Sequence, residues 1–233
     1  MPRTQLNNFG VTEKLEDDTE ENRRVYERLL ENFNTCVEML ESADFKEKKG
    51  WKLKAERNGD KVYARKSTVG PLDDSALECT LDCGVDVLFE CLWNRIEEHA
   101  KMSEEVEEMK VLRQLGPQSR VVYVRSADKL LFGKREAVLA SMYRKIGEAY
   151  VIVQTSVDLD ACPATADKIR MIFNYGCVRI SPITGSPGRL RYEGSANLDL
   201  KGSIPPALVN LIKTGKMELQ RIDKLRQLIQ SHK

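Results

Sequence analysis

The sequence predicts an α+β domain in which a strongly curled antiparallel sheet of nine strands is roofed by a long C-terminal helix. Three observations support this fold class. Nine segments carry the apolar/polar alternation with a period of two that is typical of strands. Short connections marked by Gly or Pro separate most of these segments, which favours antiparallel pairing. Amphipathic helical patterns precede and follow the strands.

The composition is that of a single globular unit and excludes several classes of protein. Among 233 residues, 37 Lys and Arg balance 36 Asp and Glu, and this formal net charge of +1 disfavours a general nucleic-acid binder. A hydrophobic fraction of 41% can fill a core. No apolar run approaches the ~18 residues of a spanning helix, and the polar, acidic start has no apolar centre like that of a secretory signal. We therefore expect a cytoplasmic protein.

The N-terminal part divides into a tail and a helix. Residues 1–20 are polar and acidic and are expected to form a flexible tail, whereas residues 21–233 are expected to form a single domain. In residues 21–41, apolar side chains recur every three or four positions with charges between them, which predicts an amphipathic packing helix. These apolar positions are Val25, Leu29, Phe33, Val37 and Leu40.

The first strands follow in residues 50–83. Trp51, Leu53 and Ala55 alternate with charged residues, and Asn58-Gly59 supplies the two positive-φ positions of a tight hairpin turn. A third alternating segment over residues 77–83 follows. Residues 84–98 then return to helical spacing, and six further strands are expected at residues 106–115, 119–125, 136–145, 149–157, 168–180 and 189–200.

The last predicted element is one continuous helix over residues 203–230. Ser203 is a suitable N-cap, and the two prolines that follow lie in the first turn, where a missing N–H is harmless. About 26 helical residues would span roughly 40 Å, the diameter of a domain, so this helix could cover the concave face of the sheet. Its apolar stripe comprises Leu208, Leu211, Ile212, Leu219, Ile222, Leu225 and Ile229.

The sequence offers little catalytic or metal-binding chemistry. It has two histidines, and we find neither a glycine-rich phosphate loop nor a nucleophile elbow. The cysteines form no CxxC pair, and in the cytoplasm they are expected to be reduced thiols on apolar faces. They are Cys36, Cys79, Cys83, Cys91, Cys162 and Cys177. We therefore expect no enzyme activity, no metal and no cofactor.

Four stretches, taken together in this order and spacing, resemble the START family of lipid transfer domains. They are GWKLKAERNGDKVYARK, EEMKVLRQLGPQSRVVYVRS, FGKREAVLASMYR and SPITGSPGRLRYEGSANLDLKGSIPPALVN. The resemblance implies a helix-grip fold with an internal hydrophobic tunnel that holds one lipid. It also implies non-vesicular lipid binding and intermembrane transfer, with transient contact at a membrane surface. The expected ligand is a sterol or a phospholipid, and we expect a monomer.

Two departures, at the start of the lid helix and at the headgroup places, limit what the resemblance implies. Ser203 stands where the family often has Trp, and Lys134, Arg135 and Glu136 stand where it has Pro, Arg and Asp. Some members hold a headgroup with an acidic or amide side chain and an arginine, and these two places fall at Val124 and Ser141 here. Uncharged residues there favour a weakly polar ligand such as a sterol, although loops can also supply polar groups to a phospholipid.

The matched positions select candidate lipid-binding residues. For the tunnel wall these are Val122, Val124, Leu139, Ser141, Met171 and Phe173; for the lid they are Leu208, Leu211, Ile212, Gly215 and Leu219. Ordinary core packing is the alternative for each wall residue. Tyr192 is expected either to offer its hydroxyl to a headgroup or to be a packed tyrosine. Gly215 has three interpretations: it allows close packing against a neighbour, it leaves room for the ligand, or it is a position where the helix can bend.

The lid also carries basic residues on its predicted outer face, which either meet an anionic bilayer or are simply solvated. They are Lys213, Lys216, Arg221, Lys224 and Arg226. We expect the lid, or the loops at residues 128–134 and 158–167, to part during lipid entry. Two alternatives stay open: an enzyme of the same fold that uses the cavity as a reaction chamber, such as a cyclase or hydrolase, and an interaction module without ligand.

Overall fold

The protein is built around one large, strongly twisted sheet. The computed structural model describes residues 5–101, 106–127, 134–204, 212 and 214–231. Within these ranges the sheet has ten strands in the order β3-β4-β5-β12-β11-β9-β8-β7-β6, and β10 pairs with β8. The strands are β3 (Lys52–Arg57), β4 (Asp60–Arg65), β5 (Asp74–Leu81), β6 (Val106–Gly116), β7 (Ser119–Ser126), β8 (Arg135–Ile146), β9 (Ala149–Ser156), β10 (Ile169–Arg170), β11 (Ile172–Pro182) and β12 (Leu190–Asp199).

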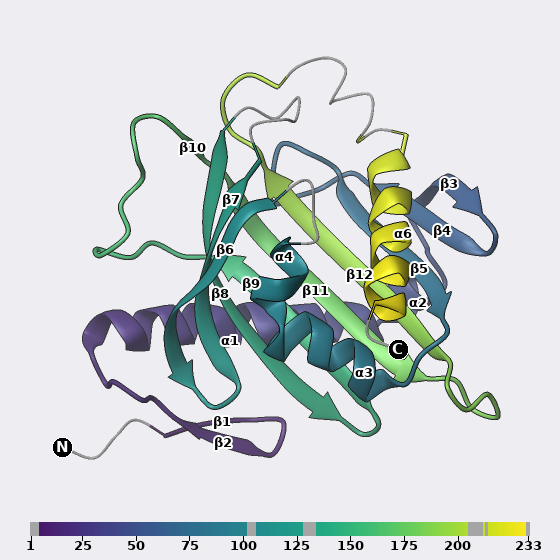
Figure 1. The fold of residues 1–233 in the computed structure, drawn as a ribbon, viewed down its shortest axis with the longest axis horizontal. Helices are drawn as coiled ribbons and strands as arrows, with labels where there is room; N and C mark the ends of the chain where they lie inside the picture. The colour runs from purple at the N-terminus through teal and green to yellow at the C-terminus, as the bar shows by residue number, and fades with distance from the viewer. Residues whose placement is uncertain (1–4, 102–105, 128–133, 205–211, 213, 232–233) are drawn as a thin grey trace.

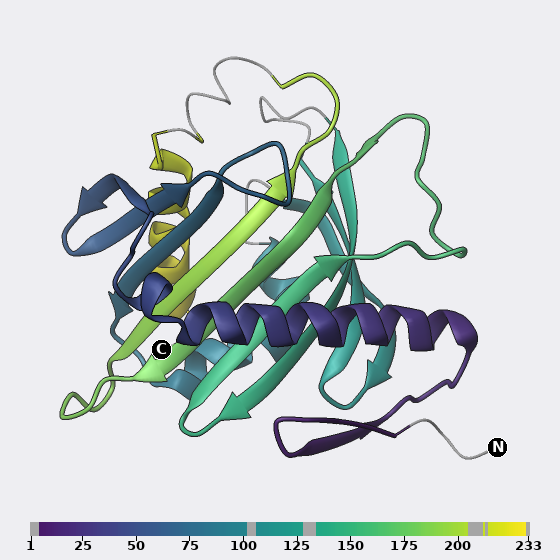
Figure 2. The ribbon, with the colours of Figure 1, turned by 180° about the vertical axis from the view of Figure 1, so that it is seen from behind.

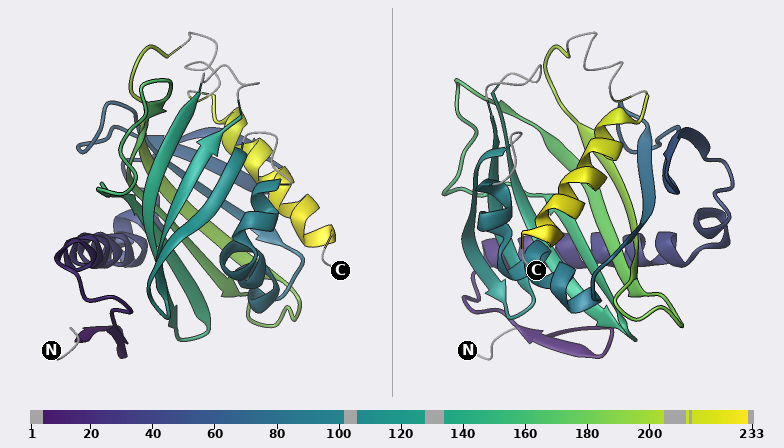
Figure 3. Two further views of the ribbon diagram at one scale, coloured as in Figure 1. Left: turned by 60° about the vertical axis from the view of Figure 1, so that its left-hand side comes forward. Right: turned by 45° about the vertical axis from the view of Figure 1, so that its right-hand side comes forward.

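The predicted nine-stranded antiparallel sheet is confirmed, with one addition. The last six predicted strands correspond to β6, β7, β8, β9, β11 and β12, and their neighbours in the sheet pair antiparallel. The additional strand is β10, a two-residue segment that pairs parallel with the start of β8. The sheet curls around the helices that pack on one of its faces (Figure 3).

Helices cover both faces of the sheet. We call the face that packs on α1 the outer face and the face that packs on α3, α4 and α6 the inner face (Figures 1 and 2). The helical elements are α1 (Glu20–Glu41), α2 (Ala43–Lys46), α3 (Val85–Phe89), the π-helical turn η1 (Glu90–Asn94), α4 (Ile96–Lys101) and α6 (Lys216–Gln230). The predicted helix over residues 84–98 is therefore two short helices joined by a π turn.

Helix α1 forms where the sequence predicts it. The Thr19 side chain accepts a hydrogen bond from the Asn22 N–H at 3.1 Å, and Glu20 and Glu21 place negative charge in the first turn, where the helix dipole favours it. The predicted apolar stripe is buried, and it packs on outward-facing side chains of β7, β8, β9 and β11. This layer forms the core on the outer face.

The first hairpin shows both the strength and the limit of the predicted alternation. Asn58 and Gly59 have φ angles of 53° and 84°, as the two-residue turn between β3 and β4 requires. Leu53, however, is 51% exposed. The strand pairing shifts register between Leu53 and Ala55, and this irregularity interrupts the alternation that placed Leu53 on the dry face.

The six cysteines, all of which lie in the described part of the chain, form no disulfide bond. Five of the six are buried and Cys162 is partly exposed. Cys36 and Cys177 lie in the outer core, whereas Cys79 and Cys83 lie under the inner helices. Burial raises the pKa of the Cys79 thiol to about 12, so this side chain behaves as a small apolar group.

The predicted flexible tail over residues 1–20 needs correction. Strands β1 (Gln5–Asn8) and β2 (Val11–Lys14) form an antiparallel hairpin, and Leu15 is fully buried in the outer core. Glu16 then extends the contact, because its N–H donates to the Leu115 carbonyl at 2.9 Å. The segment before α1 is thus fastened beneath the end of the sheet (Figure 1).

A buried carboxylate explains why this hairpin is fastened. Glu13 is 2% exposed and pairs with Arg144 of β8 at 2.8 Å between Oε2 and Nη2. The same oxygen accepts from the Tyr26 hydroxyl at 2.8 Å, and Oε1 accepts from the Ser119 hydroxyl at 2.9 Å and the Gln118 N–H at 2.6 Å. A buried charge is tolerated only with partners of this kind.

The predicted C-terminal helix also needs correction. It is not one continuous helix over residues 203–230, because Gly215 has a left-handed φ of 69° and stands as the N-cap of α6. Its N–H donates to the Ile212 carbonyl at 3.1 Å, which closes a turn. Helix α6 has 15 residues, about 22 Å, and packs on β3, β4 and β5. Residues 205–211 and 213 of the predicted helix lie outside the described residues.

Replacing Glu13 by Ala is expected to lower the free energy of unfolding by about 3–5 kcal/mol, because Arg144 would be left buried without its counter-charge. Chemical denaturation measures the change. Lys14→Ala is the matched control: this neighbouring side chain is exposed, and its loss should cost less than ~0.5 kcal/mol. Equal small effects at both positions would show that the buried pair does not hold the hairpin.

Candidate functional site

The inner face of the sheet carries two separate apolar clusters. The helix cluster lies under α3, η1 and α6 and includes Leu88, Trp93, Ile222, Leu225 and Ile229 together with side chains of β4, β5, β11 and β12. The front cluster comprises Val122, Val124, Ala137 and Leu139, with Val106, Met109, Met171 and Phe173 packed against it. Among the described residues, every member of the front cluster comes from a strand or from the residue between β10 and β11.

The front cluster brings most of the predicted wall residues together. Val122 and Val124 extend from β7, Leu139 from β8 and Phe173 from β11, and Met171 precedes Phe173. The first three are nearly fully buried, whereas Met171 and Phe173 are half-buried. The structure therefore brings five of the six predicted wall residues together. Contact with a lipid stays a prediction for each residue.

The predicted lid and headgroup residues fall elsewhere. Tyr192 and Leu219 belong to the helix cluster, and burial raises the pKa of Tyr192. Ile212 is half-buried, and Gly215 packs on β3 and β4: a Cβ there would lie 3.1 Å from Val62 Cγ1. Of the interpretations of Gly215, close packing is the one the geometry supports. Leu208 and Leu211 lie outside the described residues.

A row of polar or small residues crosses the sheet next to the front cluster. Ser141 of β8 is paired with Arg120 of β7 on one side and with Gln154 of β9 on the other, and Gln154 is paired with Gly176 of β11. Alternation places all four on the inner face, since Arg120 shares the parity of Val122. We call these residues the polar row.

Arg120 and Gln154 are absent from the sequence-predicted site. The pattern did contain a signal for Arg120, because it lies two residues before Val122 and therefore faces the same side of the sheet. A charged residue at the start of an apolar strand usually indicates the solvent-exposed end of that strand. Only the structure shows that Arg120 is 4% exposed.

Arg135 and Glu136, at the start of β8, each hold a segment that is distant in the sequence. Arg135 Nε donates to the Leu200 carbonyl at 2.8 Å, and Nη2 donates to the carbonyls of Lys201 and Ser203 at 3.1 and 3.3 Å. It thereby holds the segment that leaves β12 for the C-terminal part. Burial lowers the pKa of the Arg135 guanidinium group.

Glu136 holds the long loop after β9. It accepts from Arg170 Nη2 at 2.8 Å and from the Tyr123 hydroxyl at 2.8 Å, and Arg170 also donates to the Cys162 and Pro163 carbonyls. Burial alone would raise the pKa of Glu136, but the hydrogen bonds from Arg170 and Tyr123 outweigh it and the net pKa is lowered. The loop over residues 158–167 is thus tied to the edge of β8.

Ion pairs fasten α6 to the first hairpin. Arg226 donates to both oxygens of Asp60, at 2.7 Å from Nη1 and 2.6 Å from Nη2, and Arg57 pairs with Asp223 at 2.6 Å. Asp60 is fully buried, and its hydrogen bonds raise the pKa of Arg226. Arg226 therefore does not belong to a free basic face of the lid. Lys216 and Arg221 are exposed, and Lys213 lies outside the described residues.

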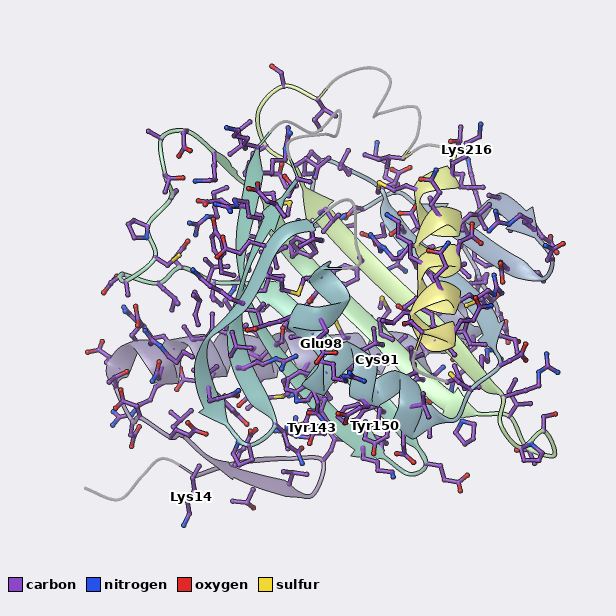
Figure 4. The ribbon with its side chains drawn as sticks, in the orientation of Figure 1. Lys14, Cys91, Glu98, Tyr143, Tyr150 and Lys216 are labelled. Atoms are coloured by element: carbon purple, nitrogen blue, oxygen red, sulfur yellow. The ribbon has the colours of Figure 1, made fainter. Side chains whose placement is uncertain are left out.

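Aromatic side chains pack α3 against the inner face of the sheet. The Phe89 ring stacks on Tyr150, with centroids 4.0 Å apart, and meets Tyr143 edge to face at 4.7 Å. The Tyr150 hydroxyl donates to Asp86 Oδ1 at 2.9 Å. Figure 4 shows Tyr143 and Tyr150 beside α3, and Lys216 at the start of α6. These contacts hold α3 on β8 and β9.

A cavity of about 580 Å³ opens between η1 and α4 on one side and the β6–β7 hairpin on the other. Arg120, Trp93, Glu97, Val111 and Gln114 contribute to its lining. Within the described ranges, no three His, Cys, Asp or Glu side chains are grouped closely enough to hold a metal ion. No helix in the described part of the chain is long and apolar enough to cross a membrane.

Comparisons with known proteins agree with this architecture. The START domain family model matches residues 31–233. The chain is 27% identical over 187 residues to the human "Steroidogenic acute regulatory protein, mitochondrial", which covers 78% of this chain and 65% of that protein. The corresponding chicken protein is 26% identical over 170 residues, 71% of this chain and 60% of its own length. The chain thus spans less than two thirds of these curated relatives.

Solved structures show the same fold. Human StAR-related lipid transfer protein 5 superimposes with a TM-score of 0.76 at 16% identity, covering 91% of this chain and all of that one. Human STARD10 gives a TM-score of 0.72 at 20% identity, covering 85% of this chain and 78% of that one. At these identities the likeness supports the fold alone.

Gly215→Ala is expected to destabilise the protein by about 1–2 kcal/mol, because an L-residue is strained at this positive φ and its Cβ would press on Val62. Denaturant unfolding measures the loss. Gly185→Ala is the control: its φ is 75°, but no atom lies within 4 Å of the added Cβ. The difference between the two variants isolates the packing of α6 on β4, and equal losses would show that this packing contributes nothing.

Proposed function

This chain belongs to the START domain family, and from that premise we propose that it sequesters one lipid in an internal apolar cavity and moves it between membranes. The family and the lipid transfer proteins of the same fold support lipid binding and transfer in general. The internal site, the single ligand and the transport step are the proposal. A cytoplasmic location at the periphery of membranes, a monomeric state and transient membrane contact belong to it as well.

The front cluster is the observation that carries the proposal. It lies on the inner face, its members are apolar, and among the described residues all of them come from strands except Met171, which lies between β10 and β11. An ordinary core layer pairs a sheet with the apolar stripe of a helix, as the helix cluster does with α6. In the proposed complex the lipid chain lies against Val124, Leu139 and Phe173.

The energetics of such a site need no charged anchor. Transfer of one CH₂ group from water into an apolar site contributes ~0.8 kcal/mol, so twelve buried methylenes give on the order of 10 kcal/mol before the ordering of the chain is subtracted. The apolar surface supplies affinity, and the few polar groups at its margin supply orientation.

Exchange of the lipid requires the site to open. Helix α6 is held by the helix cluster and by the pair of Arg226 with Asp60, so it is the fixed part of the inner layer. The loop over residues 158–167 depends on the fewer bonds of Glu136 and Arg170. We place the opening at this loop; of the other loop expected to part, over residues 128–134, residues 128–133 lie outside the described residues.

The proposed mechanism involves no covalent step, cofactor or metal. An enzyme of this fold would require titratable side chains grouped around its cavity. The front cluster consists of Val, Ala, Leu, Met and Phe, which can enclose a substrate but cannot transfer protons to it. This composition supports a binding function.

Vesicle-to-vesicle transfer of fluorescent lipids tests the proposal. Donor vesicles carry a labelled sterol, phospholipid, sphingolipid or fatty acid, and acceptor vesicles are unlabelled. We expect the protein to accelerate the transfer of at least one class in proportion to its concentration. If the protein neither extracts nor transfers any of the four classes, a carrier function is refuted.

Leu139→Trp is expected to reduce the transfer rate at least tenfold, because the larger ring occupies space that the proposed lipid would fill. If that space exists, the free energy of unfolding should change by less than about 1 kcal/mol, whereas overpacking a filled core costs 1–3 kcal/mol. Val69→Trp, at a 57% exposed position, is the control and should leave both quantities unchanged. Strong destabilisation with unaltered transfer would place the cavity elsewhere.

A further inference from the structure

Arg120 is a buried cation at the margin of the front cluster. It lies on β7, two residues before Val122 and four before Val124, so its side chain shares their face. Only 4% of it is exposed. On the neighbouring strands it is paired with Gln114 of β6 and Ser141 of β8, neither of which carries charge.

The guanidinium group of Arg120 is largely unsatisfied. Its Nε and Nη2 atoms have no hydrogen-bond partner, although both are buried. The guanidinium group makes a cation–π contact with Trp93, because Cζ of Arg120 lies over the Trp93 ring at 3.9 Å from its centroid. Burial lowers the pKa of Arg120 to about 10, opposed by the charge of Glu97, so the group is still a cation at neutral pH.

No nearby carboxylate forms a hydrogen bond with Nε or Nη2 of Arg120, although the charge of Glu97 acts on it. Glu97 Oε1 accepts from the Val111 N–H at 3.0 Å, and Glu98 Oε2 pairs with Arg95 at 2.7 Å. Both line the 580 Å³ cavity beside Arg120, as does Glu16. A buried cation whose N–H groups lack partners is strongly unfavourable, and a bound anion would satisfy them.

We propose that Arg120 binds an anionic oxygen group, a phosphate or a carboxylate, at the polar end of the lipid. The inference rests on the proposed function and specifies its ligand class. Two free N–H groups on one planar fork match the paired oxygens of such a group. The stacked Trp93 holds the plane of the fork, and Ser141 and Gln154 continue the polar row beside it.

This assignment revises the ligand class expected from the sequence. Ser141 and Val124 are uncharged at the two places where some family members hold a headgroup, and this favoured a weakly polar ligand such as a sterol. The structure sets an arginine directly opposite Ser141, on the adjacent strand. The positive charge on the inner face is therefore supplied by Arg120 of β7, not by position 141 of β8.

Paired lipids that differ only in the anionic group test the proposal. Extraction of phosphatidic acid from vesicles is compared with extraction of the diacylglycerol that has the same acyl chains, and a fatty acid is compared with its methyl ester. We expect wild-type protein to favour each acidic member. Arg120→Gln should lose on the order of tenfold in affinity for the acidic members and change less than twofold for the neutral ones.

Arg189→Gln is the matched control, because it removes the same charge from an exposed surface pair with Asp82. It should leave both preferences unchanged. Equal affinity of wild-type protein for acidic and neutral members, or a loss in Arg120→Gln that is the same for both, would overturn the inference while leaving lipid binding intact. Failure of wild-type protein to take up any lipid would instead refute the proposed function.

A second readout separates a lipid from a free anion and a ligand role from a structural one. In a Trp51→Phe background, Trp93 is the remaining tryptophan and reports on Arg120 by fluorescence. Quenching by phosphatidic acid but not by millimolar inorganic phosphate is expected; saturation by inorganic phosphate alone would overturn the lipid assignment. Arg120→Met should melt no lower than ligand-free wild type, and a large fall in Tm would show that the arginine is structural.

Discussion

The inner face of the curled sheet has to be kept from water, and this constraint organises the rest of the molecule. Helix α6 meets it over β3, β4 and β5, and α3 meets it over β9 and β11. The front cluster is buried as well, yet among the described residues it is built from strands and from Met171 between β10 and β11. The two halves of one face thus differ in which described elements pack on them, and the proposed lipid would lie against the front cluster.

Polar contacts fasten the terminal segments to this sheet. Glu13 locks the N-terminal hairpin onto Arg144, Arg226 locks α6 onto Asp60, and Arg135 holds the chain as it leaves β12. Each pairing joins a charged group that is almost fully buried to a partner far away in the sequence. Loss of its partners would leave the buried charge of Glu13, Asp60 or Arg135 unsatisfied, so these contacts help to hold each segment in place.

The sequence pattern predicted the elements that are determined by neighbouring residues in the chain. The hairpin at Asn58-Gly59 follows from turn chemistry, and α1 follows from its apolar stripe and its cap at Thr19. The parity of the inner-face strands came from the resemblance to START domains, because β7 and β8 are buried on both faces and alternation could not decide it. The family resemblance thus contributed what periodicity lacked.

Features that depend on distant residues could not be predicted in this way. The partner of Glu13 lies 131 positions away, so the polar N-terminal segment gave no sign of its fixed hairpin. The helical stripe continued through Gly215, whose left-handed conformation depends on its packing against Val62. Arg120 resembled a residue at a solvent-exposed strand end until the strands beside it were placed.

The proposed function requires the inner face of the sheet to enclose a lipid molecule. Native mass spectrometry of protein purified without detergent tests this most directly, because a ligand held by several kcal/mol survives gentle desolvation as an added mass. We expect a complex with one lipid, whose identity fragmentation would reveal. Protein that is consistently bare, even after incubation with mixed-lipid vesicles, would contradict the account.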